Sequence, residues 1–327
     1  MTSRRSVLSG GIAALAVLGA GAGVHARASA REAGFQAAFP PEGDVLDVGG
    51  VPTHVLVRGE GPDLVMIHGA SATLREWTFR LLDKLAPRYR CIAFDRPGLG
   101  YSGHLTPRYA RAFGRASETP AEQAAHLAAA YARVARGAPP IVLGHSYGGA
   151  LAIAWGLDHP ARALVPVSAP SMVWPGDLGA VVSLAASATG GGLVVPVVTA
   201  AMGLERMRGM ARAVFAPEPV PEGYFAHVGN ALALRRDSIR TNARQVDGLK
   251  PHVAAMAARH GELGLPIELV HGAADRAVPA EVHSIPTAAR IASARLALVE
   301  GAGHMVHQTR PDAIVAAVDR AAARAGL

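Results

Sequence analysis

The sequence of 327 residues has little cysteine, few charges and no charge runs, and each lack excludes a class of protein. A single cysteine, Cys91, excludes an intramolecular disulfide framework and a metal site built from cysteines. Only 17% of the residues are charged and 50% are apolar, which excludes a disordered chain and supports a large core. No run of six like charges occurs, so a nucleic-acid-binding arm is not expected. The 37 glycines and 23 prolines follow no repeat, which excludes collagen-like and low-complexity chains.

The basic net charge of +7 comes partly from the N-terminus. The first 28 residues hold Arg4, Arg5 and Arg27 and no acid, so the rest of the chain carries 29 basic and 25 acidic side chains, a net charge of +4. We interpret this as ordinary solubility charge and expect no polyanionic partner.

Residues 1–28 have the pattern of an export signal. A short basic N-terminus precedes the uncharged residues 7–24, and small residues then recur at Val24–Ala26 and Ala26–Ala28, as a signal peptidase requires. Ser3 to Leu8 resembles a twin-arginine signal, with valine in place of the usual phenylalanine. We predict an exported bacterial protein, periplasmic or secreted, whose fold excludes residues 1–28 and whose mature form has no stable membrane span. An anchor formed by residues 7–24 and a disordered cytosolic extension are the alternatives.

Short apolar runs alternate with helical patterns through most of the remaining chain. This alternation predicts an α/β fold, with a mostly parallel central sheet covered by helices on both faces. The expected elements are a hairpin at 44–58, strands at 63–68, 90–95, 140–144, 163–167, 267–271 and 295–299, and helices at 74–85, 121–136, 149–158 and 312–324.

The interval 169–264 breaks this alternation. It contains no clear strand, and its pattern is helical around glycine- and proline-rich loops. We predict a core made of residues 40–168 and 265–327, with 169–264 inserted as a helical cap over the edge of the sheet that bears the site.

Gly144-His145-Ser146-Tyr147-Gly148 fits G-x-S-x-G and lies between a predicted strand and a predicted helix. That context is typical of a nucleophile elbow, in which small flanking residues allow a sharp turn that exposes the serine hydroxyl. A serine hydroxyl needs an adjacent base, which an acid must orient.

Two later segments supply candidates for the base and the acid. Asp275 follows the predicted strand at 267–271, and His304 follows the strand at 295–299. Because the carboxyl ends of parallel strands meet at one edge of a sheet, we expect Ser146, Asp275 and His304 to come together there.

These motifs resemble the α/β-hydrolase fold superfamily, in the branch that includes haloperoxidase-like perhydrolases, epoxide hydrolases, dehalogenases and small-ester hydrolases. The matching segments are His68-Gly69, 95–102, the elbow, 271–279 and 301–311. The resemblance implies that Ser146 is the nucleophile, His304 the general base and Asp275 its orienting acid. It also implies an oxyanion hole formed by the backbone N–H groups of Ala70 and Tyr147.

Two departures from the branch carry information. Dehalogenases and epoxide hydrolases use an aspartate at the position of Ser146, so serine favours acyl transfer to water. Many relatives have a glutamate at the position of Gln308, which puts the local hydrogen bonding in doubt.

The other candidate residues have structural interpretations. We expect His68 and Asp95 to brace loops, His145 to pack against the sheet, and His307 not to be the base. Trp77 and Trp174 are candidates for the substrate pocket or for simple packing. The remaining histidines show no metal-ligand spacing and there is no phosphate-binding loop, so no metal or cofactor is expected.

The sequence therefore favours a cofactor-independent serine hydrolase that cleaves carboxylic esters of small molecules through an acyl-enzyme. The same residues suit a perhydrolase, a lactonase, an amidase or a carbon–carbon bond hydrolase. The alternative outside enzymes is a receptor-like scaffold that binds a ligand with little turnover. The pattern fixes neither the substrate nor the oligomeric state.

Overall fold

The computed structural model describes residues 4–327, and the side chains from residue 19 onward. Eight strands form one sheet in the order β1-β2-β4-β3-β5-β6-β7-β8. Strands β1 and β2 form the predicted antiparallel hairpin, β2 pairs antiparallel with β4, and all other pairs are parallel. The predicted fold class is thus confirmed. The strands are β1 (Asp44–Val48), β2 (Val51–Arg58), β3 (Asp63–Ile67), β4 (Arg90–Phe94), β5 (Ile141–His145), β6 (Ala163–Val167), β7 (Ile267–Gly272) and β8 (Ala294–Val299).

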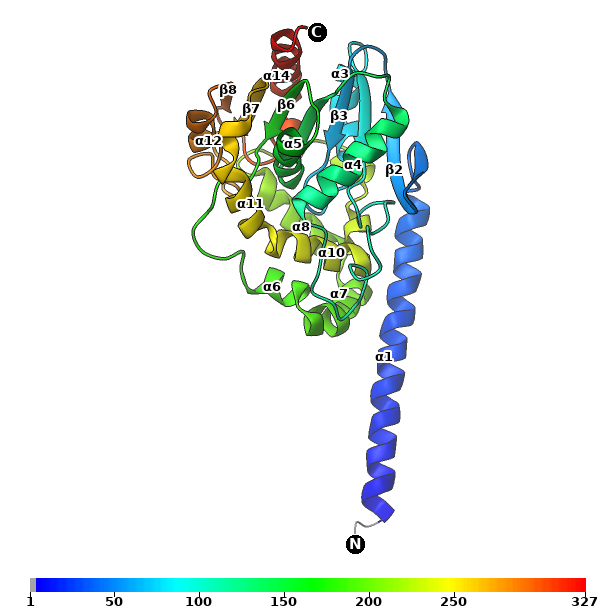
Figure 1. Ribbon diagram of the computed structural model, residues 1–327. Coiled ribbons are helices and arrows are strands. Elements are labelled where there is room, and N and C mark those ends of the chain that lie inside the picture. The colour runs from blue at the N-terminus through cyan, green and yellow to red at the C-terminus, as the bar shows by residue number, and fades with distance from the viewer. Residues whose placement is uncertain (1–3) are drawn as a thin grey trace.

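Helices cover both faces of the sheet (Figure 1). Successive side chains of β3 point to opposite faces of the sheet, and all of them are apolar, so both faces need a cover. Leu64 and Met66 belong to one apolar core, and Val65 and Ile67 belong to the other. The first core is closed by α2 (Arg75–Thr78), α3 (Leu81–Leu85) and α14 (Pro311–Arg324), and the second by α4 (Pro120–Val134), α5 (Tyr147–Asp158) and α11 (Leu249–Ala258). Two shorter helices, α12 (Ser284–Arg290) and α13 (Val306–Thr309), follow β7 and β8.

The sequence predicts a single helix over 74–85, but the structure has two helices there, α2 and α3. The prediction is wrong in this respect. The break falls at Phe79 and Arg80. The Phe79 ring packs against the rings of Tyr224 and His227 from the insertion, with centroid separations of 5.6 Å to each. This tertiary contact interrupts a helix that the apolar spacing alone would continue.

The chain between β6 and β7 contains only helices among its regular elements. In Figure 1 they form a layer at one end of the sheet, which we call the cap. They are α6 (Ala180–Ala186), η1 (Gly190–Val194), α7 (Val195–Ala201), α8 (Leu204–Phe215), α9 (Tyr224–Val228), η2 (Asn230–Leu234), α10 (Arg236–Asp247), α11 and η3 (His260–Glu262).

The N-terminal helix α1 (Arg4–Ala38) runs along the cap and then extends beyond it (Figure 1). Ala28 is fully buried, and the Arg27 guanidinium donates to the Ala200 carbonyl at 2.9 Å. The sequence predicts that residues 1–28 lie outside the fold. Ala28 and Arg27 differ from this prediction, because Ala28 is buried and Arg27 is bonded to α7.

Among the residues from 19 onward, no single helix is both long and apolar enough to cross a bilayer. One bent pair, Ala180–Ala186 with Gly190–Ala201, meets the criteria of length and composition together, with an angle of 85° between its halves.

Candidate active site

Ser146 occupies a strained turn between β5 and α5. Its backbone has φ 53° and ψ −119°, a conformation that non-glycine residues rarely adopt. Close packing leaves no room for side chains beside it, because a Cβ on Gly144 would lie 2.0 Å from the Gly148 carbonyl oxygen. A Cβ on Gly148 would lie 2.1 Å from the Ile67 carbonyl oxygen. The elbow motif therefore has glycines because the strand, the turn and the helix touch through their backbones.

The three residues predicted to come together do so at the carboxyl edge of the sheet. The Ser146 hydroxyl lies 3.0 Å from Nε2 of His304, and Nδ1 of His304 lies 2.8 Å from Oδ2 of Asp275. Both distances are within hydrogen-bonding range. In this arrangement Nδ1–H donates to the carboxylate, which leaves Nε2 free to accept the serine proton.

Asp275 is held as a carboxylate by four donors. Its Oδ1 accepts from the backbone N–H groups of Ala277 and Val278, both at 2.9 Å. Its Oδ2 accepts from His304 and, at 3.1 Å, from Nε2 of His271. Burial opposes ionisation, but the hydrogen bonds from His271 and His304 outweigh it and hold the pKa of Asp275 well below its usual range.

His271 has a role here that sequence analysis missed. Its Nδ1 accepts from the Ser284 hydroxyl at 2.5 Å, which fixes Nε2 as a donor that the Val278 carbonyl at 2.6 Å and Asp275 at 3.1 Å share. The signal was present in the sequence, because His271 lies four residues before Asp275 in the segment that carries the family resemblance.

Ala70 and Tyr147, the two residues expected to form the oxyanion hole, lie at the pocket that Ser146 lines. Neither backbone N–H donates to another residue in the described part of the chain. Tyr147 is the first residue of α5, where a helix leaves its N–H groups free. The arrangement leaves two donors available for an oxygen that develops negative charge beside Ser146.

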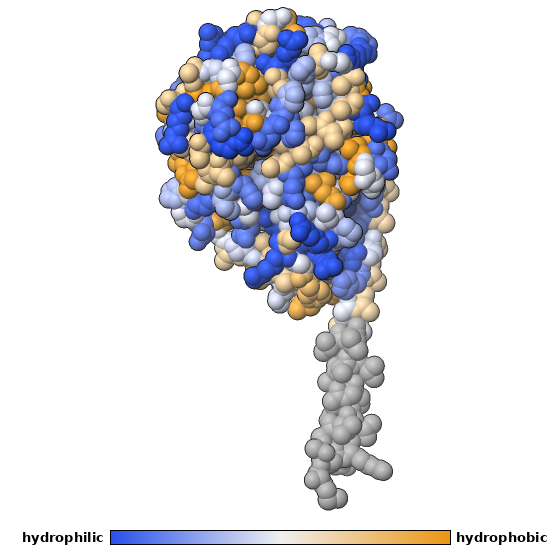
Figure 2. All heavy atoms as spheres, in the orientation of Figure 1, coloured by the Kyte–Doolittle hydropathy of each residue, from blue (hydrophilic) through white to orange (hydrophobic). Residues whose placement is uncertain are grey.

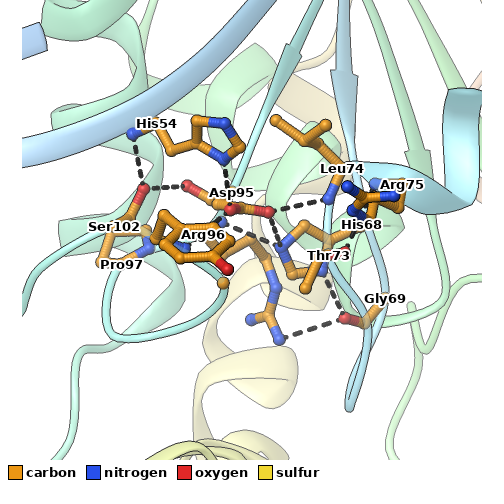
Figure 3. A network of polar contacts seen from close by, with 12 residues as sticks. His54, His68, Gly69, Thr73, Leu74, Arg75, Asp95, Arg96, Pro97 and Ser102 are labelled. Carbon is orange, nitrogen blue, oxygen red and sulfur yellow. Dashed lines mark hydrogen bonds and ion pairs between the residues drawn. The ribbon is translucent and has the colours of Figure 1, made fainter. Parts of the chain in front are cut away.

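A buried network holds the loop that carries Ala70 (Figure 3). The Asp95 carboxylate accepts from the Leu74 N–H at 2.7 Å, from the Tyr101 N–H at 2.8 Å and from Nδ1 of His54 at 2.6 Å. Burial opposes ionisation of Asp95, yet the His54 hydrogen bond and charge outweigh it and lower its pKa. Asp95 thus braces loops, as predicted, and does not contact His304.

His68 connects this network to the same loop. Its Nδ1–H donates to the Gly69 carbonyl at 2.8 Å, and its Nε2 accepts from the Arg96 N–H at 2.9 Å (Figure 3). Burial, together with the Arg96 charge, lowers the pKa of His68 to about 4, so the neutral ring can accept a hydrogen bond at neutral pH. Its predicted bracing role is confirmed.

An apolar pocket of about 280 Å³ opens beside Ser146. Trp174 lines it, but Trp77 does not: Trp77 is fully buried in the core and lies against the His307 ring, so its prediction as a pocket residue is wrong. The other residues around the pocket are Ala70, Tyr147, Pro170, Pro175, Leu178, Val246, Leu249, Ala277, Val278, Pro279, Val282 and His283.

A second buried cluster lies behind His304 and centres on Glu76, which sequence analysis did not single out. Its carboxylate accepts from the Tyr224 hydroxyl at 2.5 Å and from the Gln308 amide at 2.8 Å, and Nε2 of His307 lies 3.3 Å away. Burial raises the pKa of Glu76. The Gln308 amide nitrogen is thus satisfied by the Glu76 carboxylate, whereas its buried Oε1 has no hydrogen-bond partner among the described residues.

His145 joins this cluster to the base. Its ring lies against that of His307, with centroids 3.8 Å apart, and its Nε2–H donates to the His304 carbonyl at 3.0 Å. Burial and the neighbouring His307 and His304 lower the pKa of His145 well below its usual value. As predicted, neither His145 nor His307 is placed to accept the serine proton.

The described side chains hold no group of three or more His, Cys, Asp or Glu residues arranged to bind a metal ion. The site brings together the Ser146 hydroxyl, the His304 imidazole and the Asp275 carboxylate beside the apolar pocket.

The chain is similar to known proteins in sequence and in fold. The chain is 28% identical over 263 residues to the magnesium-chelatase 30 kDa subunit of Rhodobacter capsulatus, covering 78% of this chain and 84% of that protein. An α/β-hydrolase fold protein from Burkholderia ambifaria is 25% identical with a TM-score of 0.65, covering 85% of this chain and 99% of the other. The esterase RhEst1 of Rhodococcus sp. is 22% identical with a TM-score of 0.63, covering 84% and 96%. The model of the alpha/beta hydrolase family matches residues 64–317, and the chain belongs to that family.

Proposed function

We propose that the protein is a serine hydrolase that cleaves carboxylic esters through an acyl-enzyme on Ser146. The observation that carries this proposal is the line of hydrogen bonds from the Ser146 hydroxyl through His304 to Asp275, at 3.0 and 2.8 Å, at the wall of an apolar pocket. The similarity to an esterase supports it at the level of the fold.

The proposed reaction has two halves. His304 takes the proton of Ser146 as the oxygen attacks the ester carbonyl, and the N–H groups of Ala70 and Tyr147 donate to the resulting oxyanion. The ester C–O bond then breaks, and the proton on His304 passes to the leaving alcohol. Water repeats the sequence on the acyl-enzyme and releases the acid and the free serine.

The walls of the pocket favour a neutral, apolar acyl group. None of the lining residues is Lys, Arg, Asp or Glu, and a charged substrate group buried there would have no charged partner. This favours uncharged esters over substrates that bear their own carboxylate.

The nucleophile is tested by Ser146→Ala. The purified variant should lose turnover of p-nitrophenyl butyrate by at least about 1000-fold and keep its melting temperature. Ser168→Ala is the matched control, because Ser168 also has positive φ (46°) after a strand but lies at the end of β6 and has no place in the line of hydrogen bonds. Unchanged turnover in Ser146→Ala would overturn the proposal.

A panel of p-nitrophenyl esters, lactones, amides and peracid assays separates the possible reactions. Multiple turnovers on esters, with kcat/KM rising with acyl length until the pocket is filled, is the expected outcome. Stoichiometric labelling by a fluorophosphonate without turnover on any member of the panel would instead identify a receptor-like scaffold.

We also propose that the chain is exported, on the twin-arginine-like segment Ser3 to Leu8. Replacing Arg4 and Arg5 with lysine should leave the protein on the cytoplasmic side, as measured by protease access in spheroplasts. Equal export of the lysine variant would contradict this proposal.

A further inference from the structure

The cap presents apolar side chains to solvent at one end of the molecule. Val181 and Leu184 on α6, Leu193 in η1 and Val197 on α7 are exposed by 49 to 78%. Phe113, 62% exposed, joins them, because its ring lies where a Cβ on Gly192 would approach it to 2.2 Å. We call these five side chains the apolar cap surface. Figure 2 shows apolar residues gathered at this lower end of the body, beside the emerging helix.

The sequence behind this surface is unusual for a solvent-facing segment. No Asp, Glu, Lys, Arg or His occurs from Leu178 to Leu204, although α6, η1 and α7 are surface helices. A soluble helix normally carries charges on its outer face. A contiguous exposed apolar patch of this kind marks an interaction site.

One edge of the surface is basic, whereas Ser183 on α6 donates to the Asp247 carboxylate on α10 at 2.8 Å. The segment 105–117 that carries Phe113 also contains Arg108, Arg111 and Arg115, all exposed, and contains no acid. Its backbone is held against the cap, since the Arg244 guanidinium donates to the carbonyls of Tyr109 and Ala112. In an anionic bilayer, the acyl chains accept apolar side chains and the negatively charged headgroups attract arginines. The apolar side chains and the arginines beside them therefore suit the interface of such a bilayer.

Helix α1 leaves the body at this same end. Arg31 donates to the Thr199 and Met202 carbonyls at 2.8 and 2.7 Å, and so satisfies the carboxyl end of α7. Glu32 accepts from the backbone N–H of Arg236 at 2.7 Å and pairs with its guanidinium, and so caps the start of α10.

The direction of α1 is therefore set by its contacts with the cap. Beyond them the helix continues past α6 and α7 (Figure 1), and its residues 7–24 carry no charge. Eighteen helical residues extend about 27 Å, close to the thickness of a bilayer's hydrocarbon core. The hydrogen bond from Arg27 to α7 and the burial of Ala28 favour a retained N-terminal segment over a removed one.

We propose that the apolar cap surface docks into the interface of a lipid bilayer that residues 7–24 of α1 enter. Leu178 lines the catalytic pocket, is 40% exposed and lies two residues before the start of α6, so an exposed apolar side chain of the pocket wall lies next to α6 in the chain. On the proposed esterase function, this places the pocket mouth where esters dissolved in the membrane can reach it.

The test uses the full chain reconstituted in phosphatidylglycerol-containing vesicles. Cys91 is free and fully buried, so one added cysteine can be labelled selectively with a nitrobenzoxadiazole fluorophore. Leu193→Cys and Val181→Cys report on the cap surface. Val45→Cys on β1 and Leu298→Cys on β8 are matched controls, because both positions are exposed apolar residues on the strands at the two edges of the sheet.

Spin-labelled lipid should quench the labels at positions 193 and 181 at least about twofold and leave those at 45 and 298 unquenched. Weak quenching at all four positions would overturn the proposal. Shielding of the cap labels in detergent that grows with protein concentration would overturn it in favour of a second copy of the chain. The measurement does not require activity: a Ser146→Ala background should give the same quenching, so failure of the esterase proposal would be seen separately.

Discussion

At the scale of single residues, the elbow around Ser146 is limited by backbone contacts. Gly148→Ala would place a methyl group 2.1 Å from the Ile67 carbonyl oxygen in the rigid sheet, and should destabilise the fold by about 3 kcal/mol. Gly209→Ala is the control, since nothing lies within 4 Å of its Cβ position in α8, and it should be neutral or stabilising by up to about 1 kcal/mol. Urea unfolding measures both, and equal effects would contradict this account.

Asp275 gives a second prediction at this scale. Asp275→Asn removes the charge that orients and stabilises the protonated His304, and should lower kcat about 1000- to 10000-fold with little change in KM. Asp312→Asn removes an exposed carboxylate paired with Lys84 and should leave both constants unchanged. Steady-state ester hydrolysis distinguishes them, and a loss below about tenfold for Asp275→Asn would remove Asp275 from the proposed mechanism.

At the scale of elements, the cap is joined to the core by an ion-paired histidine. His104, in the loop after β4, lies 2.8 Å from Glu118 before α4 and 3.0 Å from Asp237 on α10. Burial lowers the pKa of His104, but the hydrogen bonds that its ring donates to Asp237 and Glu118 outweigh burial and raise the value to about 9. Protonated His104 therefore holds the cap at neutral pH.

The pH dependence follows from the sign of this shift. A raised pKa contributes stability that is fully present below the ordinary value of about 6.5 and is lost as pH rises through about 9. Wild type should lose about 2 to 3 kcal/mol of unfolding free energy between these limits, and His104→Gln should lose much less. His252→Gln, on α11, should behave as wild type in the same urea titrations. An identical pH dependence in His104→Gln would contradict the assignment.

A second link between cap and core runs through Tyr224 on α9. Tyr224→Phe leaves the buried carboxylate of Glu76 without its 2.5 Å donor and should cost about 2 kcal/mol of unfolding free energy. Tyr89→Phe also removes a hydrogen bond to a carboxylate, but Asp319 is partly exposed and water can replace the donor, so the expected cost is below about 1 kcal/mol. Thermal unfolding of the two variants tests whether burial makes the difference.

At the scale of the whole molecule, α1 is part of the folded protein. Glu32→Gln breaks its pair with Arg236 and removes the charge at the start of α10, and should destabilise the full chain by about 2 kcal/mol. Glu205→Gln, which breaks an exposed pair with Arg208, should leave the unfolding free energy unchanged within error. Equal unfolding curves for the two variants would show that α1 does not stabilise the cap.

The sheet, the elbow and the order of serine, acid and base could be predicted because each depends on local signals. Buried strands are short apolar runs, and Gly144 to Gly148 mark a turn that only small residues allow. The edge on which Asp275 and His304 meet follows from parallel topology alone.

What could not be predicted depends on contacts between distant segments. Glu76 has no motif, and its position under His304 arises from Tyr224 and Gln308, 148 and 232 residues away. Residue type alone leaves Trp77 a candidate for the pocket or for packing, and the core that it joins is formed by segments distant in sequence. The packing of Ala28 and Arg27 on α7 was hidden by the signal-like composition of residues 1–28, since the same small residues suit both a cleavage site and a close helix contact.

The cap leaves the sheet after β6 and returns to it at β7, and these two strands are paired neighbours. Six of the residues around the pocket belong to this single stretch of chain, whereas Ser146, Asp275 and His304 lie outside it. Exchange of that stretch between relatives, by recombination or in the laboratory, would give the same reaction a new range of acyl groups in one step.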